Sequence, residues 1–151
     1  MSAVFAYLHT LSMIALGSML FAQLLTFDLL HHQPGLRRFW LLSCGVAASA
    51  TSALASGVAL LIWTDQGATF YLHNPVFYIK LAIFAAMLLI AITPARIIVQ
   101  WQRQAVTGAV PEAGMILLVR RYLTIEMILL LAIPLAASLA ARGIGSPVSA
   151  S

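Results

Sequence analysis

The stretch Tyr71-Leu-His-Asn-Pro-Val-Phe-Tyr-Ile-Lys80 leads directly into an apolar run from Leu81 to Thr93, which ends at Pro94. Lys80 therefore lies inside a segment that is long enough to cross a membrane, for which about 20 residues are needed. An ionisable group at membrane depth costs roughly 2.5–3.5 kcal/mol and by default indicates a functional site. The long lysine stem is an equally good explanation, since it can carry the ammonium group to the nearest interface.

The composition places the chain among integral membrane proteins. It has 151 residues, of which 62% are hydrophobic and 8% are charged, and its mean hydropathy is +1.00. Soluble domains carry about 25% charged residues. The formal net charge is +4, but the basic residues lie between apolar segments and indicate membrane topology rather than nucleic-acid binding. The single cysteine, Cys44, provides no disulfide framework.

Four apolar segments reach the length of about 20 residues that a membrane-spanning helix needs. They cover residues 4–27, 39–63, 75–98 and 115–141. We therefore expect an all-α integral membrane protein, an antiparallel bundle of four transmembrane helices in one domain, residues 1–145. We expect residues 146–151 to form a short flexible tail.

The basic residues predict the orientation in the membrane. Six of them lie in or beside the connections 28–38 and 99–114, namely Arg37, Arg38, Arg96, Arg103, Arg120 and Arg121. On the opposite side only Arg142 lies near a span, and the connection 64–74 has no Lys or Arg. Because positive charge favours the cytoplasmic side, we expect a multi-pass protein of the bacterial cytoplasmic (inner) membrane with both termini outside.

Several side chains able to bind a cofactor are expected in the outer half of the bundle. His9 and Lys80 each lie about five residues inside the outer end of a span, so at a rise of 1.5 Å per residue they reach a similar depth. His73 and Tyr78 lie at or just above that level. Two imidazoles, an ammonium group and a phenol therefore form a candidate site, although tyrosine also serves as an ordinary interface anchor.

The second span carries small residues at every fourth position. One row is Gly45, Ser49, Ala53 and Gly57, and the adjacent row is Cys44, Ala48, Ser52 and Ser56. Such rows let helix backbones approach closely in lipid. They also offer a smooth wall for a flat cofactor, and the sequence leaves both interpretations open.

Glu126 is an acidic residue inside the fourth span. We expect it to form a structural ion pair with Arg96, because ionisable groups within spans pair with one another. A proton relay is the alternative, since such carboxylates commonly serve pumps and transporters. Pro134, further along the same span, is expected to kink it.

A family resemblance is carried by two runs. They are WTDQGATFYLHNPVFYIKLAIFAAMLLIAITPARIIVQWQRQ at residues 63–104 and VRRYLTIEMILLLAIPLAASLAARGIG at residues 119–145. Both resemble a bacterial membrane family known as domain of unknown function 2214, and the similarity extends from AYLHTL at residues 6–11 through Gly145. The resemblance implies four helices and no assigned activity.

More distantly, the chain resembles the HemJ-type protoporphyrinogen oxidases and the CopD-like membrane proteins. The shared features are Leu8-His9 followed by Gly17, His31 at the far end of the first helix, and Tyr78-Ile-Lys80-Leu81. In HemJ-type proteins the first histidine is implicated in binding haem b, and the lysine belongs to the active region. The resemblance therefore implies a haem site at His9 and a catalytic role for Lys80. Those proteins usually have a histidine where this chain has Tyr78.

Three functional hypotheses follow. The first is a protein that binds haem b or a porphyrin and has a redox role, in which His9 and His73 supply axial nitrogens, Tyr78 adjoins the cofactor and a quinone exchanges electrons. The second is CopD-like handling of copper by His9, His73 and Met13. The third is a scaffold or accessory subunit without a cofactor, which docks through the small-residue rows as a homodimer or in a larger membrane complex.

Overall fold

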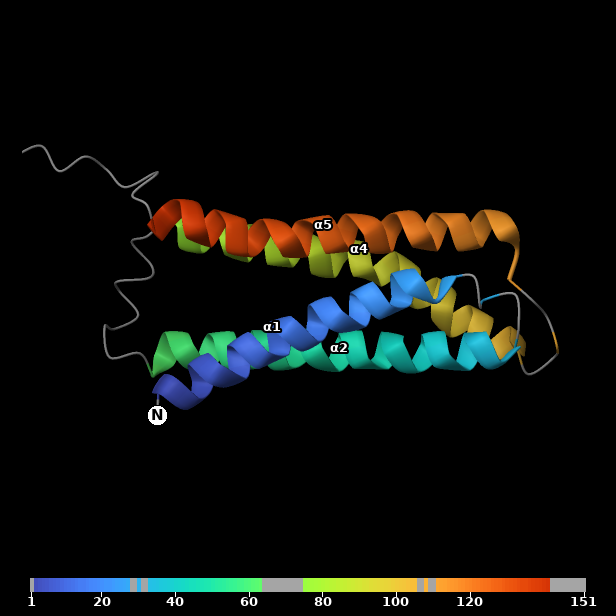
Figure 1. The fold of residues 1–151 in the computed structure, drawn as a ribbon, viewed down its shortest axis with the longest axis horizontal. Coiled ribbons are helices and arrows are strands. Elements are labelled where there is room, and N and C mark those ends of the chain that lie inside the picture. The colour runs from blue at the N-terminus through green and yellow to red at the C-terminus, as the bar shows by residue number, and fades with distance from the viewer. Residues whose placement is uncertain are drawn as a thin grey trace, which may run out of the picture.

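Four long helices make up the part of the fold that the structure describes (Figure 1). The computed structural model describes residues 2–27, 30, 33–63, 75–105, 108 and 111–141. Within these residues the helices are α1 (Ser2–Leu25), α2 (Gln33–Ile62), α4 (Pro75–Ala105) and α5 (Ala113–Ala141). The described residues contain no strand, so the expected all-α class is confirmed.

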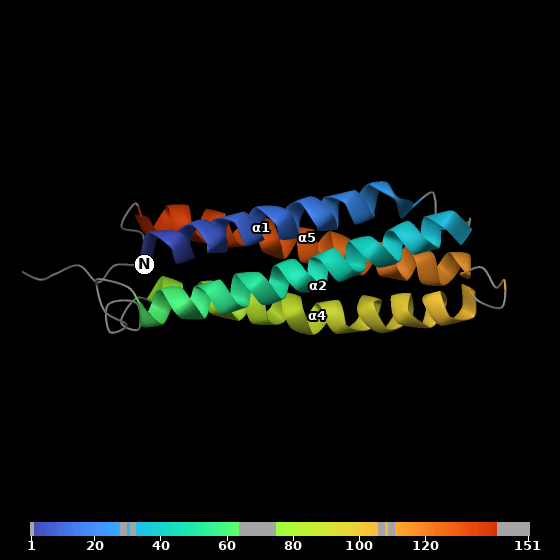
Figure 2. The ribbon, with the colours of Figure 1, turned by 90° about the horizontal axis from the view of Figure 1, so that it is seen from below.

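The helices form an antiparallel ring. α2 lies beside α1 and α4, and α5 lies beside α4 and α1, as Figures 1 and 2 show from two sides. α1 and α4 occupy one diagonal of the ring, and α2 and α5 occupy the other. Packing is closest within the α1–α2 pair and within the α4–α5 pair. This order decides which side chains can share a site.

Two helices extend beyond the apolar segments that predict them. α2 begins with Pro34 in its first turn, and α4 begins at Pro75. Proline suits the start of a helix, where its missing N–H has no partner to lose and its φ is already helical. The additional turns of α2 and α4 carry polar residues such as Arg37 and Arg103, which are exposed. Hydropathy therefore finds the membrane-crossing part of each helix and underestimates its full length.

Within the described residues, three helices are long and apolar enough to cross a membrane. The spans are Ala3–Leu25, Gly35–Ile62 and Pro75–Gln104. α5 has 29 residues and runs alongside them. The outside of the bundle is covered by large apolar side chains such as Leu89, which is 69% exposed. A contiguous apolar surface of this extent suits hydrocarbon better than water.

Both chain ends of the bundle lie on the same side. In Figure 1 the start of α1 and the end of α5 are found at one end of the molecule. This arrangement is the one expected for an even number of antiparallel helices. The assignment of that side to the outside of the cell stays a prediction from the arginine distribution.

The core is a central column of large apolar side chains. Leu16 and Leu20 of α1, Phe39 of α2 and Val119 of α5 are almost inaccessible to solvent. Phe27 contacts Phe39 edge to face, with ring centroids 5.3 Å apart. Such aromatic pairs add about 0.5–1.5 kcal/mol to the burial of their area. The contact therefore helps to hold together the end of the α1–α2 pair that is remote from the chain termini.

Candidate functional site

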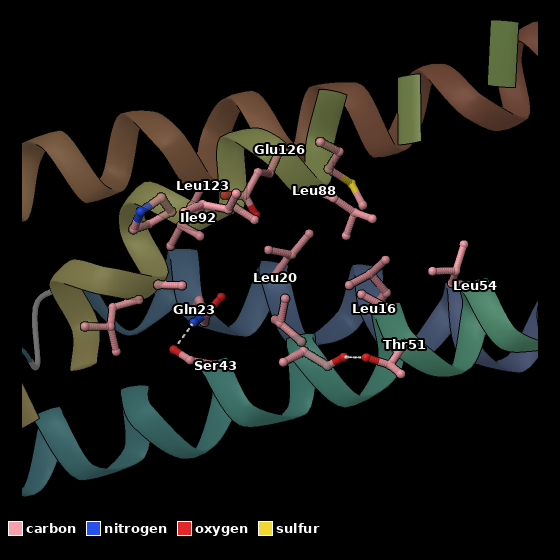
Figure 3. Close-up of a pocket in the computed structure, with 18 residues that line it drawn as sticks. Leu16, Leu20, Gln23, Ser43, Thr51, Leu54, Leu88, Ile92, Leu123 and Glu126 are labelled. Atoms are coloured by element: carbon pink, nitrogen blue, oxygen red, sulfur yellow. Dashed lines mark hydrogen bonds between the residues drawn. The ribbon is translucent and has the colours of Figure 1, made fainter. Parts of the chain in front are cut away.

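A cavity of about 320 Å³ lies inside the ring of helices. All four helices line it, and most of its wall is aliphatic, including Leu16, Leu20, Leu88 and Ile92 (Figure 3). Pockets for small molecules span about 300–1,000 Å³, so this cavity is large enough for a small ligand. Its few polar groups decide what it can bind.

Gln23 of α1 directs its amide group into this cavity (Figure 3). Its Nε2 donates to Ser43 Oγ on α2 at 2.7 Å, and the Ser43 hydroxyl donates to the Phe39 carbonyl at 2.8 Å. Because the serine proton is already used, Ser43 Oγ accepts from Gln23, which fixes the orientation of the amide. Gln23 Oε1 is left buried without a hydrogen-bond partner among the described residues.

Glu126 of α5 enters the cavity from the opposite side. It is 2% exposed, and its Oε1 also has no hydrogen-bond partner in the part of the chain that the structure describes. Figure 3 shows its carboxyl group directed into the space between α5 and the α1–α2 pair. An ionised carboxylate is unfavourable in such surroundings without a compensating group. A bound proton or a ligand atom at this position would remove that cost.

The hydroxyl groups of the cavity wall are already committed. The Thr51 hydroxyl donates to the Ala47 carbonyl at 2.8 Å, and the Ser43 hydroxyl is used within its own helix. Pro94, which is buried in the α4 side of the wall, has no N–H to offer. Among the described residues, the cavity thus presents two acceptor oxygens without a hydrogen-bond partner, one from Gln23 and one from Glu126.

His9 lies outside this cavity, between α1 and α2. Its Nδ1 is 2.9 Å from the Ala53 carbonyl oxygen and 3.3 Å from Ser56 Oγ. The carbonyl oxygen can only accept, and the Ser56 hydroxyl is used as a donor to the Ser52 carbonyl at 2.6 Å. Nδ1 therefore carries the proton, and Nε2 of the neutral ring keeps the lone pair with which a histidine binds a metal.

The structure places the predicted outer-half residues His9, Lys80 and Tyr78 on two different helices. Lys80, which is half-buried, and Tyr78, which is 51% exposed, belong to α4, diagonally opposite α1. Met13 is partly buried against the hydrophobic core, and His73 lies outside the described residues. In the described ranges no three His, Cys, Asp or Glu side chains form a group that could hold a metal ion. The roles of Lys80, Tyr78 and His73 stay predictions from the sequence.

Arg96 and Glu126 are not brought together. Arg96 is exposed on α4, whereas Glu126 is buried in the bundle. Within the described residues, neither Arg96 nor any other side chain bonds to Glu126 Oε1. The carboxyl group is thus directed to the cavity rather than to the expected arginine.

The small-residue rows of α2 pack against α1. A Cβ atom on Gly45 would lie 3.1 Å from Met19 Sδ, and one on Gly57 would lie 3.3 Å from the ring of His9. Between these levels, Ser52 Oγ is 2.7 Å from an α1 hydroxyl, that of Ser12. The rows therefore serve close helix packing. The row that contains Gly45 and Gly57 is covered by α1, whereas Cys44, Ala48 and Ser52 of the adjacent row are exposed.

Sequence reasoning missed Gln23 and Ser43 as site residues. Gln23 is an uncharged polar residue inside an apolar span, and its hydrogen bond to Ser43 depends on the contact between α1 and α2. The available signal is that Gln23 and Glu126 both interrupt apolar segments in the half of the bundle remote from the chain termini. Only the order of the helices in the ring brings the two into one cavity.

Comparison with known proteins assigns a family and no activity. The family model described as Predicted membrane protein (DUF2214) matches residues 1–145. No curated protein and no solved structure matches the chain. The matched region contains all four helices, the central cavity and His9.

Proposed function

We infer, since the chain belongs to the family described as Predicted membrane protein (DUF2214), that its function is carried out within a bilayer. We propose that the protein binds a small lipid-soluble molecule in the central cavity. The ligand would carry a hydroxyl or N–H group that donates to Gln23 Oε1, and a second polar group beside Glu126.

The observation that carries this proposal is the pair of unpaired oxygens in one cavity. Gln23 Oε1 and Glu126 Oε1 are both buried and lack hydrogen-bond partners among the described residues. Leaving a buried polar group unsatisfied costs about 1–3 kcal/mol. Two such groups on the wall of the same cavity are typical of a site in which a ligand supplies the missing bonds.

The chemistry of the cavity narrows the class of ligand. Its aliphatic wall favours a largely apolar molecule, and the acceptor at Gln23 requires a hydrogen-bond donor. Glu126 can donate a proton to a ligand oxygen when it is protonated and can accept from a ligand hydroxyl when it is ionised. A quinol has an apolar ring and two hydroxyl groups, which meets each of these requirements.

Binding of decylubiquinol to the full-length protein in nanodiscs tests the proposal. The quinol retained in excess of that in empty nanodiscs should saturate at one molecule per protein. Gln23→Leu should weaken quinol binding about tenfold, the effect of roughly 1.4 kcal/mol in a hydrogen bond. Decylubiquinone should bind more weakly than the quinol, because its carbonyl groups cannot donate to Gln23.

A matched control is Gln100→Leu, which changes an exposed glutamine of α4 that does not line the cavity. This variant should bind quinol as the unchanged protein does. Equal binding by the Gln23→Leu and Gln100→Leu variants, or the absence of saturable binding, would refute the proposal.

A second candidate function, haem b binding at His9, is supported by the hydrogen bonding of the His9 imidazole. The hydrogen bond from Nδ1 to the Ala53 carbonyl orients the ring and leaves Nε2 as a ligand atom. In this proposal His9 and His73 would hold the haem iron through ring nitrogens, and Lys80 would neutralise a propionate. Haem would provide one-electron chemistry for a redox role. The copper alternative uses the same Nε2 together with Met13.

An absorption spectrum of the purified protein, oxidised and then reduced with dithionite, tests the second candidate. Cells should be supplied with iron and a haem precursor. A Soret band that shifts on reduction is expected, and His9→Ala should abolish it, whereas Gln23→Leu should leave it unchanged. A folded protein without a visible band, or a His9→Ala variant that keeps the full band, would contradict haem binding at this position.

A further inference from the structure

The α2–α4 side of the cavity wall is built from side chains that also reach the outside of the bundle. On α2 these are Ala47, Thr51 and Leu54, and on α4 they are Ile92 and Ala95. Leu54 is 45% exposed and Ile92 is 44% exposed, although both line the cavity. A residue that is at once in the wall of a cavity and on the molecular surface marks an opening. We call these five residues the α2–α4 seam.

The wall formed by α1 is closed on both sides. Gln23 and Ser43 join α1 to α2 at the edge of the cavity, and Gly45 lies directly against Met19 further along the same interface. Towards α5, a Cβ atom on Gly17 of α1 would be in van der Waals contact with a leucine side chain at 3.4 Å. Among the described residues, the exposed part of the cavity wall therefore faces outward between α2 and α4.

The seam lies at the depth of the hydrocarbon core. Ala47 is 14 residues from the start of α2 and 15 from its end, which at 1.5 Å per residue places it about 21 Å from either end. Ala91, which lines the cavity from α4 at the same level, is also close to the middle of its helix. Because the hydrocarbon core is about 30 Å thick, the opening meets lipid tails rather than water.

We propose that the ligand of the central cavity enters and leaves sideways through the α2–α4 seam, directly from the bilayer. This inference rests on the proposed function and deepens it, because it restricts the ligand to molecules that partition into hydrocarbon. The ligand is drawn from the pool dissolved in the membrane, and its occupancy follows its mole fraction in the lipid. Small side chains at Ala47 and Ala95 keep the passage open.

Exchange of a fluorinated decylubiquinol between protein and lipid, measured by fluorine NMR in nanodiscs, tests the route. Ala47→Trp and Ala95→Trp place a large ring in the seam and should slow exchange about tenfold, with a smaller effect on the bound fraction, as expected for an obstructed passage. Ala47→Leu is a milder change that should slow exchange in the same direction. The control is Ala48→Trp, on the exposed face of α2 beside the seam but not in the cavity wall.

The outcomes separate the route from the site. Slow exchange in the seam variants alone, with exchange in Ala48→Trp as fast as in the unchanged protein, supports lateral entry. Binding that depends on Gln23 but exchanges equally fast in the Ala47→Trp, Ala95→Trp and Ala48→Trp variants would overturn the route and leave the proposed function standing. The absence of any saturable binding to the unchanged protein would overturn both.

Discussion

Replacing Glu126 by leucine is expected to make the protein more stable. The carboxyl group is 2% exposed, faces an aliphatic cavity and has an oxygen without a hydrogen-bond partner among the described residues. No nearby charge in the described structure compensates it. A stable bundle would gain from an apolar side chain at this position, so the carboxyl group indicates function at the expense of stability.

The magnitude follows from two contributions. Removing an unsatisfied buried polar group recovers about 1–3 kcal/mol. The leucine side chain adds apolar contact in a place where the cavity wall is already aliphatic, and exchanges of buried ionic groups for apolar residues of similar volume gain up to about 4 kcal/mol. We therefore expect the Glu126→Leu variant to gain about 2 kcal/mol. At about 2–4 °C per kcal/mol for a chain of this size, Tm should rise by roughly 4–8 °C.

Thermal unfolding in a mild detergent, followed by circular dichroism, measures this gain. Glu126→Gln should lie between the unchanged protein and Glu126→Leu, because the amide is neutral but still polar. Thr124→Leu is the control, since Thr124 is exposed on the same helix and its replacement should change stability by less than about 0.5 kcal/mol. The same Glu126→Leu variant should lose quinol binding, which links the gain in stability to a loss of function.

A loss of stability of 1 kcal/mol or more in Glu126→Leu would refute this reasoning. It would mean that the carboxyl group is held by a partner, and the first such partner to examine is Arg96, as the sequence alone suggests. In that case Arg96→Met should destabilise the protein by a similar amount. If the reasoning is correct, Arg96→Met has little effect, because Arg96 is exposed on α4.

Three further predictions concern α2 and its contacts, and the first uses Gly114 of α5 as a reference position. Gly114→Ala, with nothing within 4 Å of the new Cβ, should raise the free energy of unfolding by about 0.5–1 kcal/mol. Gly57→Ala crowds the His9 imidazole at 3.3 Å, so its free energy of unfolding should be at least about 1 kcal/mol lower than that of Gly114→Ala. Equal stabilities of the two variants in thermal unfolding would contradict the close packing. Ser12 and Ser52 share a 2.7 Å hydrogen bond, and a double-mutant cycle of Ser12→Ala and Ser52→Ala should give a coupling energy of about 0.6 kcal/mol, with an upper limit of about 1.7. A coupling energy of zero would show that the bond contributes nothing to stability. Cys44, exposed on α2, should resist a charged maleimide in sealed vesicles and react after denaturation, because the reactive thiolate needs water. Rapid labelling of Cys44 in intact vesicles would show that lipid does not cover the surface of α2 around it.

The sequence predicts the helices well because lipid imposes one strong rule. A span must be apolar over about 20 residues, and the four apolar segments accordingly become α1, α2, α4 and α5. The small-residue rows likewise predict that α2 packs closely against another helix, and Gly45 and Gly57 meet α1 as expected. These are properties of single segments, which a sequence read in order displays directly.

The site is harder to predict because depth does not determine the position of a helix around the ring. His9 and Lys80 lie at similar depths in their spans, but they belong to α1 and α4, which are not neighbours in the ring. Gln23 and Glu126 lie on helices that are neighbours, and both line the cavity. The order of the helices around the ring is set by packing across all four, and no single segment contains that information.

The hydrogen bonds of α1 have a consequence for biosynthesis. His9, Ser12 and Gln23 each bond to α2, and they are spread over about 20 Å of the helix at 1.5 Å per residue. All of these partners have been synthesised once the ribosome reaches residue 63, before any part of α4 exists. The amino-terminal hairpin can therefore lock together on its own as it leaves the translocon, and the later hairpin then closes the cavity against a finished surface. A fragment of residues 1–63 inserted into vesicles should accordingly show cross-linking between cysteines placed at Ser12 and Ser52, and a fragment without that cross-link would show that the two hairpins assemble together.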